Sequence, residues 1–159
     1  MDLRPPSERV DPRARWMWTC TEALRCLPLL AVLVLAGGPW NWFDAPPWLW
    51  AFVLGLMLAY VALVPQWRYL VHRWEVTETA VYTQTGWWAR ERRIAPMSRV
   101  QTVDHREGAV ARLFGLATVR VTTASAAGAL TIEGLGQARA LDIVDELTRM
   151  ADSVAGDAT

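Results

Sequence analysis

The sequence predicts a membrane-anchored α+β protein, in which a hairpin of two apolar helices precedes a curled antiparallel sheet closed by a further helix. Two apolar stretches, residues 24–43 and 48–64, approach the length of a bilayer-spanning helix, roughly 17–25 residues. From about residue 69, short runs of alternating apolar and polar residues stand between glycines and prolines, a pattern typical of consecutive strands. Residues 137–151 then show the apolar spacing of an amphipathic helix, which we expect to cover an open end of the sheet.

The composition limits both the number of domains and the available chemistry. A chain of 159 residues leaves about 90 for a domain after the hairpin, enough for one hydrophobic core. All 16 basic residues are arginine, which excludes a phosphate-loop lysine and Schiff-base chemistry. Cys20 and Cys26 lack the spacing of a zinc site or a disulfide framework, so we interpret them as small apolar residues at the membrane interface.

These patterns divide the chain into four segments. The first residues, 1–11, mix charge and proline without an apolar period, which indicates disorder. The last residues are small and polar, which indicates a frayed end. The segments are a cytoplasmic tail with an interfacial part at 1–22, the helical hairpin at 23–66, the folded domain at 67–151 and a disordered tail at 152–159.

Aromatic and basic residues flank both spans, as is typical of segments at the membrane surface. Arginines precede the first span and follow the second, but the connecting loop has none, so the positive-inside rule predicts that both termini are cytoplasmic. No ionisable residue interrupts the centre of either span, which argues against a transporter or channel. The predicted contacts with the membrane surface are Trp16, Trp18, Trp67, Arg68 and Tyr69.

The domain is expected to contain six strands, a short helical turn and the final helix. Pro65 is expected to end the second span, so that the first strand begins near residue 69. The clearest strand is 118–123, where Val119 and Val121 alternate with polar residues. The other strands are expected at 69–76, 80–85, 87–94, 100–105 and 129–133, with the helical turn at 109–114. On the final helix, the expected apolar stripe is Ala140, Val144, Leu147 and Ala151, flanked by Leu141 and Ile143.

Two short motifs in the domain carry a family resemblance. Arg99-Val100-Gln101 is one, and Arg112 followed by Gly115-Leu116-Ala117 is the other. With the sequence around them, they resemble the YdbS-like bacterial pleckstrin-homology (PH) membrane proteins, and the similarity covers the hairpin and nearly the whole domain. The resemblance implies a two-helix anchor in a bacterial inner membrane that carries a PH-like β-barrel or sandwich with a C-terminal capping helix. An accessory role in envelope stress or peptide resistance is suggested by the resemblance alone.

Two groups of arginines are candidates for interaction. Arg90, Arg92 and Arg93 follow a pair of tryptophans, and this cluster either contacts anionic lipid headgroups or a partner, or is a charged edge strand that discourages aggregation. The basic motif of eukaryotic inositide-binding PH domains is missing from 72–83, which argues against specific inositide binding. In the family motifs we expect a structural role, with the guanidinium groups bonding backbone carbonyls where the chain leaves the sheet; these residues are Arg99, Gln101, Arg112 and Gly115.

No group of residues points to a reaction. A nucleophile elbow, a zinc-ligand spacing and a phosphate loop are all missing from the sequence, so no catalytic residue, cofactor or metal is predicted. The predicted function is a non-enzymatic protein-binding or scaffolding module that recognises a partner through exposed strand edges. The alternative is recognition of anionic lipid headgroups. The predicted partners are the lipid bilayer and a membrane protein or a second copy of the chain, with no nucleic acid and no small-molecule substrate.

Overall fold

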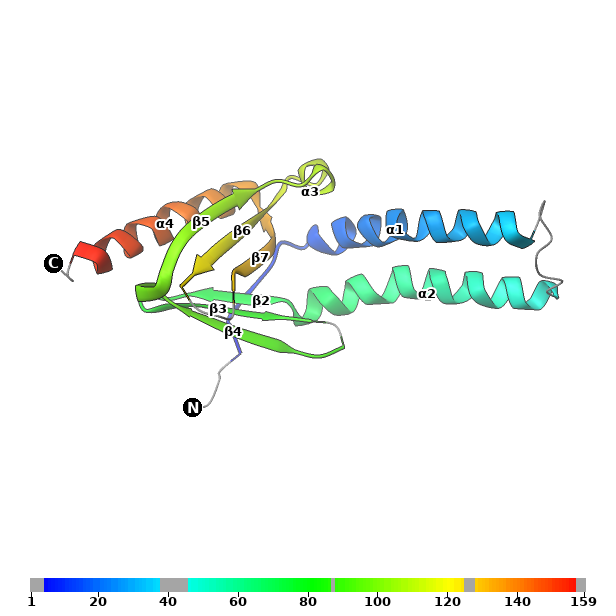
Figure 1. The fold of residues 1–159 in the computed structure, drawn as a ribbon, viewed down its shortest axis with the longest axis horizontal. Coiled ribbons are helices and arrows are strands. Elements are labelled where there is room, and N and C mark those ends of the chain that lie inside the picture. The colour runs from blue at the N-terminus through cyan, green and yellow to red at the C-terminus, as the bar shows by residue number, and fades with distance from the viewer. Residues whose placement is uncertain (1–4, 38–45, 87, 125–127, 157–159) are drawn as a thin grey trace.

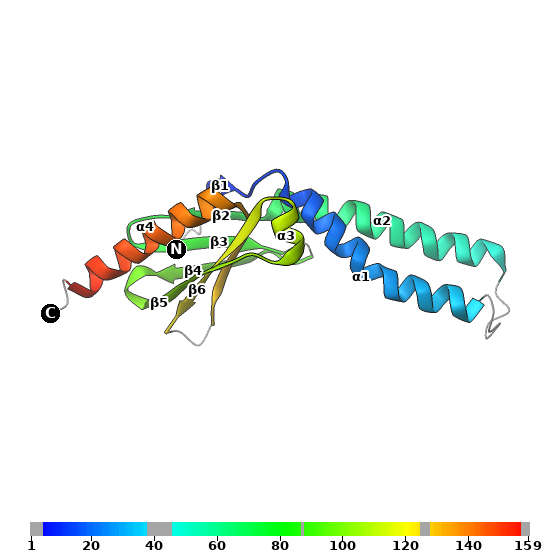
Figure 2. The same ribbon diagram turned by 90° about the horizontal axis from the view of Figure 1, so that it is seen from above.

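Two long helices extend side by side from one end of a β-rich domain (Figures 1 and 2). The structure is a computed structural model, and it describes residues 5–37, 46–86, 88–124 and 128–156. The helices are α1 (Ala14–Gly37) and α2 (Pro47–Val71), and both are long and apolar enough to cross a membrane by length and composition. The predicted helical hairpin is therefore present, although the expected end of the first span at residue 43 lies outside the described residues.

The second helix is longer than predicted. It continues through Pro65 to Val71, so the expected stop at Pro65 and the expected strand from residue 69 are both wrong. Pro65 is buried, and packing against neighbouring segments holds the helix together at a residue that lacks a backbone N–H. Only His72 separates α2 from the first long strand of the domain, so the domain is joined to the helix without a linker.

The domain consists of two antiparallel sheets and a C-terminal helix. The four-stranded sheet has the order β1 (Glu8–Arg9), β2 (Arg73–Val76), β3 (Ala80–Thr85) and β4 (Glu91–Pro96). The three-stranded sheet has the order β5 (Val100–Arg106), β6 (Leu116–Thr123) and β7 (Leu130–Gly136). The helical elements are η1 (Met97–Arg99), α3 (Ala109–Leu113) and α4 (Gln137–Gly156). The predicted alternation in β6 is confirmed, because Val119 and Val121 are fully buried.

Residues 5–11 are part of the domain, which corrects for them the prediction of a disordered tail over residues 1–11, while residues 1–4 lie outside the described part of the chain. Glu8 pairs with Trp74 of β2, and Val10 lies in the core with 2% of its surface exposed. The Asp11 backbone N–H donates a 2.9 Å hydrogen bond to the Gly134 carbonyl of β7. One buried valine among charges and prolines makes no periodic pattern, so this strand could not be predicted from the sequence.

The core lies between the two sheets and is closed at one end by α4 (Figure 1). The face of α4 that enters the core is Ala140, Ile143 and Leu147, so Ile143 is at the centre of the stripe rather than beside it. Leu141 is exposed instead. The helix also extends to Gly156, so the disordered tail predicted at 152–159 is wrong for 152–156, and 157–159 lie outside the described residues.

The two sheets form an open sandwich. The order of strands leaves β4 at one edge of the first sheet and β7 at one edge of the second, and no ladder joins them. Across this seam, Arg93 Nη1 donates a 3.4 Å hydrogen bond to the Ala129 carbonyl. The predicted PH-like sandwich is confirmed, while the curled sheet does not close into a barrel.

Gly134 packs closely against the start of α1. Its φ of +75° favours glycine, and a Cβ there would lie 2.7 Å from the Ala14 Cβ. We expect Gly134→Ala to lower the free energy of unfolding by about 2–4 kcal/mol, because backbone strain and overpacking add. Urea-dependent pulse proteolysis of the full chain in micelles measures the loss.

Two other glycines are matched controls for this prediction. Gly128 has a φ of +77° with open space around it, so Gly128→Ala isolates the backbone strain. Gly108 has neither feature, so Gly108→Ala should be nearly neutral. Equal losses for Gly134→Ala and Gly128→Ala would show that the contact with α1 contributes nothing.

Candidate binding site at the membrane–domain junction

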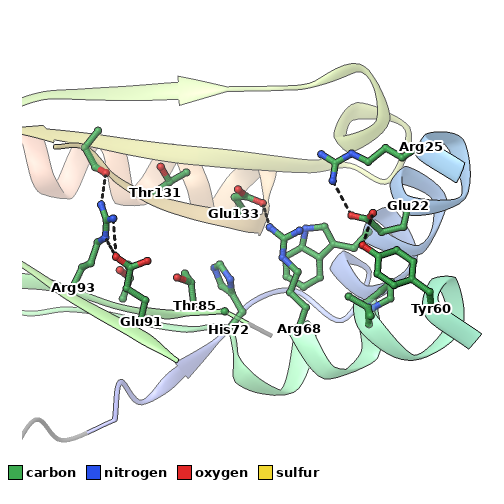
Figure 3. Close-up of a pocket in the computed structure, with 16 residues that line it drawn as sticks. Glu22, Arg25, Tyr60, Arg68, His72, Thr85, Glu91, Arg93, Thr131 and Glu133 are labelled. Carbon is green, nitrogen blue, oxygen red and sulfur yellow. Dashed lines mark hydrogen bonds and ion pairs between the residues drawn. The ribbon is translucent and has the colours of Figure 1, made fainter. Parts of the chain in front are cut away.

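A cavity of about 440 Å³ lies where the two long helices join the domain (Figure 3). Its lining comes from α1, α2, the two strands β3 and β4 of the first sheet, and β7 of the second sheet. The cavity therefore lies at the membrane end of the open seam. Its volume is within the range of roughly 300–1,000 Å³ that is usual for small-ligand sites.

Three arginine–glutamate pairs line the cavity. Arg68 Nη2 lies 2.7 Å from Glu133 Oε2, and this pair joins α2 to β7. Within α1, Arg25 lies 2.8 Å from Glu22, and within β4, Arg93 lies 2.7 Å from Glu91. The formal charges of these side chains cancel, so the cavity is rich in charge but neutral in sum.

Glu22 links the two long helices. Its side chain is largely buried and accepts a 3.4 Å hydrogen bond from the Tyr60 hydroxyl of α2, besides its ion pair with Arg25. A buried carboxylate needs such partners, because a charge removed from water without compensation is costly. The hydrogen bond between Tyr60 and Glu22 therefore fixes the positions of α1 and α2 relative to each other beside the cavity.

His72 is a buried polar side chain at the cavity. Only 2% of its surface is exposed, and neither ring nitrogen has a hydrogen-bond partner among the residues that the structure describes. Burial, with a smaller effect of the Arg68 charge, lowers the pKa of His72 to about 4, so the ring is neutral at pH 7. A neutral imidazole carries one donor and one acceptor, and buried groups of this kind normally have a partner.

Trp18 forms a wall between His72 and Arg68. Its ring centroid lies 5.5 Å from that of His72, and the Arg68 guanidinium carbon lies 4.5 Å from the indole centroid, a cation–π contact. Trp18 is only 3% exposed, which corrects the prediction that it contacts the membrane surface. Trp16 and Trp67 are half exposed and remain candidates for that contact, whereas Tyr69 packs against the core.

The comparisons with known proteins agree with this fold. The family model described as "Bacterial PH domain" matches residues 25–151, most of the chain. The chain belongs to the bacterial PH domain family. It is also 28% identical, over 153 residues, to the UPF0699 transmembrane protein YdbS of Bacillus subtilis (strain 168), covering 92% of this chain and 96% of that protein. No solved structure matches. The predicted YdbS-like family is thus confirmed, and the protein is a membrane protein with a bacterial PH domain.

The three arginines that were predicted to form a cluster near β4 do not lie together in the structure. Arg90 precedes the strand, which begins at Glu91. Arg92 Nε donates a 3.0 Å hydrogen bond to Gln84 Oε1, and its register places it on the face opposite to Arg93. Of the three arginines, Arg93 alone lines the junction cavity.

The family motifs of the bacterial PH domain lie away from the cavity. The side chains of Arg99, Gln101 and Arg112 are exposed, and within the described ranges none of them bonds a backbone carbonyl, so the structure does not support the role expected of the two guanidinium groups. Gly115 has a geometric reason for its place. Its φ is +64°, and a Cβ there would lie 3.1 Å from Arg13 Nη1.

The side chain of Arg13 is held in place by Asp11. The Arg13 backbone N–H and its Nε both donate to Asp11 Oδ1, at 2.9 and 3.0 Å. This contact lowers the pKa of the Asp11 carboxyl and raises the pKa of the Arg13 guanidinium. The start of α1 is thereby held beside Gly115 and β7.

The sequence did not identify several residues of this site. These residues come from α1, α2, the link after α2, and β7, and no regular spacing in the sequence relates them. They are Glu22, Tyr60, His72 and Glu133. Over the described part of the chain, no group of three or more His, Cys, Asp or Glu residues is placed to hold a metal ion. The side chains that line the cavity can form hydrogen bonds and ion pairs.

Proposed function

We propose that this bacterial PH domain protein is a non-enzymatic binding module at the membrane surface, and that its junction cavity binds the headgroup of a phospholipid. The observation that carries the proposal is the buried, unpartnered His72 in a charged cavity from which two membrane helices extend (Figure 3). A cavity at the end of spanning helices lies at the depth of lipid headgroups. Both ring nitrogens are themselves buried, so a ligand there would supply the partner that the imidazole lacks once a neighbouring side chain moves aside.

The charges of the cavity favour a zwitterionic headgroup. Guanidinium groups bind phosphate oxygens through short, charge-assisted hydrogen bonds, and Arg68 of α2 and Arg93 of β4 both line the cavity. The paired carboxylates of Glu91 and Glu133 suit an ammonium group. Because the lining is neutral in sum, a headgroup with both a phosphate and an amine complements it better than a purely anionic one.

Native mass spectrometry of the full chain tests this proposal. The probes are phosphatidylethanolamine, phosphatidylglycerol and the water-soluble phosphoethanolamine, so that a lipid is distinguished from a free phosphate. We expect Arg68→Gln to weaken retention of phosphatidylethanolamine about tenfold, or about 1.4 kcal/mol, since it removes a charged donor. Ala129→Trp should do the same by filling the cavity, because Ala129 lines it beside Arg93.

A matched control separates occupancy of the cavity from general damage. Leu141→Trp adds the same ring to an exposed position on α4, away from the cavity, and should retain the lipid. Equal retention by Ala129→Trp and Leu141→Trp would reject the cavity as the headgroup site. Preference for phosphatidylglycerol would keep the site but reject its zwitterionic specificity.

The free edge of β4 favours a second candidate function, recognition of a protein partner. On its outer side β4 has no paired strand among the described residues, and Ile94 on this strand is 44% exposed. A partner strand can add to such an edge through backbone hydrogen bonds. A photo-crosslinker at Ile94 should capture one protein in cells at high salt, and a crosslinker at exposed Thr148 on α4 should not. Identical capture at both positions would reject the edge as a specific surface.

We also propose that both termini lie in the cytoplasm of a bacterial cell, with the anchor in the inner membrane. The supporting observation is the distribution of arginine, which flanks the hairpin on the domain side and is absent from the connecting loop. A fluorescent protein fused to the C-terminus should then fluoresce, whereas an alkaline phosphatase fused there should stay inactive. The opposite pair of results would invert the topology.

A further inference from the structure

Two exposed apolar side chains lie at the end of the domain from which the helices leave. Trp88, in the turn between β3 and β4, is 88% exposed, and Leu113, at the end of α3, is 82% exposed. Both figures show α3 beside the start of α1, and the β3–β4 turn beside the end of α2 (Figures 1 and 2). The two segments that carry these residues therefore lie beside different helices of the hairpin.

Direct contacts place both segments beside the helices. Gln84, near the end of β3, donates a 3.0 Å hydrogen bond from Nε2 to the Val71 carbonyl at the end of α2. The turn after it is tight, because Gly86 has a φ of +112° and a Cβ there would overlap the Ala89 carbonyl oxygen. On the other side, α3 contacts α1, and Arg13 lies against Gly115.

The character of the two segments suits the membrane interface. A single exposed leucine needs no explanation, but Trp88 and Leu113 are the most exposed large apolar side chains among the described residues of the domain. Each has an exposed arginine close by, Arg90 and Arg112. Tryptophan favours the headgroup region, and each arginine near an anionic surface contributes about 1 kcal/mol.

We propose that Trp88 and Leu113 insert into the leaflet that borders the domain, so that the domain rests on the membrane through two apolar tips as well as its helical anchor. The occupant of this surface is lipid, because the spanning helices fix the membrane at this end of the molecule and each tip has an exposed arginine close to it in the sequence. Three points of attachment restrict the tilt of the domain. The surface is separate from the junction cavity, since neither Trp88 nor Leu113 lines it.

Spin labels on the full chain test the insertion. Cysteines replace Trp88, Leu113 or Leu141 in a Cys20→Ser, Cys26→Ser background, and the protein is reconstituted into vesicles of phosphatidylethanolamine and phosphatidylglycerol. Labels at 88 and 113 should collide more often with oxygen than with a polar nickel complex, because oxygen partitions into lipid. The label at 141, an exposed leucine on α4, the helix that runs from the domain away from the hairpin (Figure 1), should show the reverse. Equal accessibility at all three positions would overturn the proposal.

A second measurement uses side chains whose replacement leaves the core untouched. In Trp88→Ser, Leu113→Ser, both apolar tips are lost, and trypsin cleavage after Arg90 and Arg112 in vesicles should accelerate about tenfold, which corresponds to about 1.4 kcal/mol of interfacial binding. Cleavage after Arg149, exposed on α4, should keep its rate. If the double variant is cleaved at Arg90 and Arg112 as slowly as the wild type, the two tips do not hold the domain on the membrane.

Discussion

Replacement of Trp18 by alanine is expected to destabilise the fold by about 3–5 kcal/mol, the cost typical of truncating a buried tryptophan. The indole is 3% exposed and lies between the domain and the helical hairpin. It contacts His72 and Arg68, and its Cζ2 atom lies within 3.5 Å of the position of a Cβ on Gly134. Without the ring, a space opens between α1, the end of α2 and β7, so the wall of the junction cavity is lost as well.

Trp16→Ala is the matched control, because it removes the same side chain two positions earlier on the same helix. Trp16 is 54% exposed, so its loss should change the free energy of unfolding by less than about 0.5 kcal/mol. Pulse proteolysis in urea, on the full chain in micelles, measures both variants. Similar losses for the two would mean that Trp18 does not join the hairpin to the domain.

The two tryptophans also show what a local sequence pattern cannot predict. Both stand beside arginines before an apolar stretch, and that pattern predicts the headgroup region for both. Two positions apart on a helix, however, side chains point about 200° away from each other. One face of α1 meets β7, which is far away in the sequence, and no local pattern carries that contact.

Elements with a regular period were predictable. The alternation in β6 and the apolar spacing of α4 follow from burial of one face, so the sequence indicated both, although it placed Ile143 beside the stripe rather than within it. The helical hairpin was predictable from hydropathy. The length of α2 beyond Pro65 and the pairing of β1 could not be predicted, because tertiary packing overrides the local signals there.

The junction cavity was not predictable for the same reason. Its polar residues are single members of otherwise ordinary segments, such as Tyr60 within an apolar helix and Glu133 within a strand. They form a site only because the open sandwich and the end of the hairpin meet. The ion pair between Arg68 of α2 and Glu133 of β7 joins the hairpin to the sandwich directly, and its partners are 65 positions apart in the sequence.

The second large effect expected is a loss of stability in mild acid that depends on His72. The unfolded chain binds a proton at this residue near its ordinary pKa of 6.5, whereas in the folded protein burial lowers the pKa of His72 to about 4. Above pH 6.5 the ring is neutral in both states and contributes nothing. As the pH falls below 6.5, the unfolded state is protonated first, so the free energy of unfolding decreases, by about 2 kcal/mol between pH 7 and pH 5.

Charged side chains from several other elements also line the cavity at His72. These side chains are Arg68 of α2, Glu22 of α1, Glu91 of β4 and Glu133 of β7. Their effect is common to the wild type and to a variant at position 72, so the difference between the two isolates the histidine.

His72→Gln is that variant, since glutamine keeps a polar side chain but has no charge at any pH. The free energy of unfolding of the full chain in micelles, measured from pH 7 to pH 5, should fall by about 2 kcal/mol less in His72→Gln than in the wild type. His105→Gln, at the other histidine of the chain, controls for general loss of an imidazole. If His72→Gln leaves the slope of the wild type unchanged, the imidazole is not held neutral by the fold, and the cavity lacks the unpaired polar group on which headgroup binding is argued.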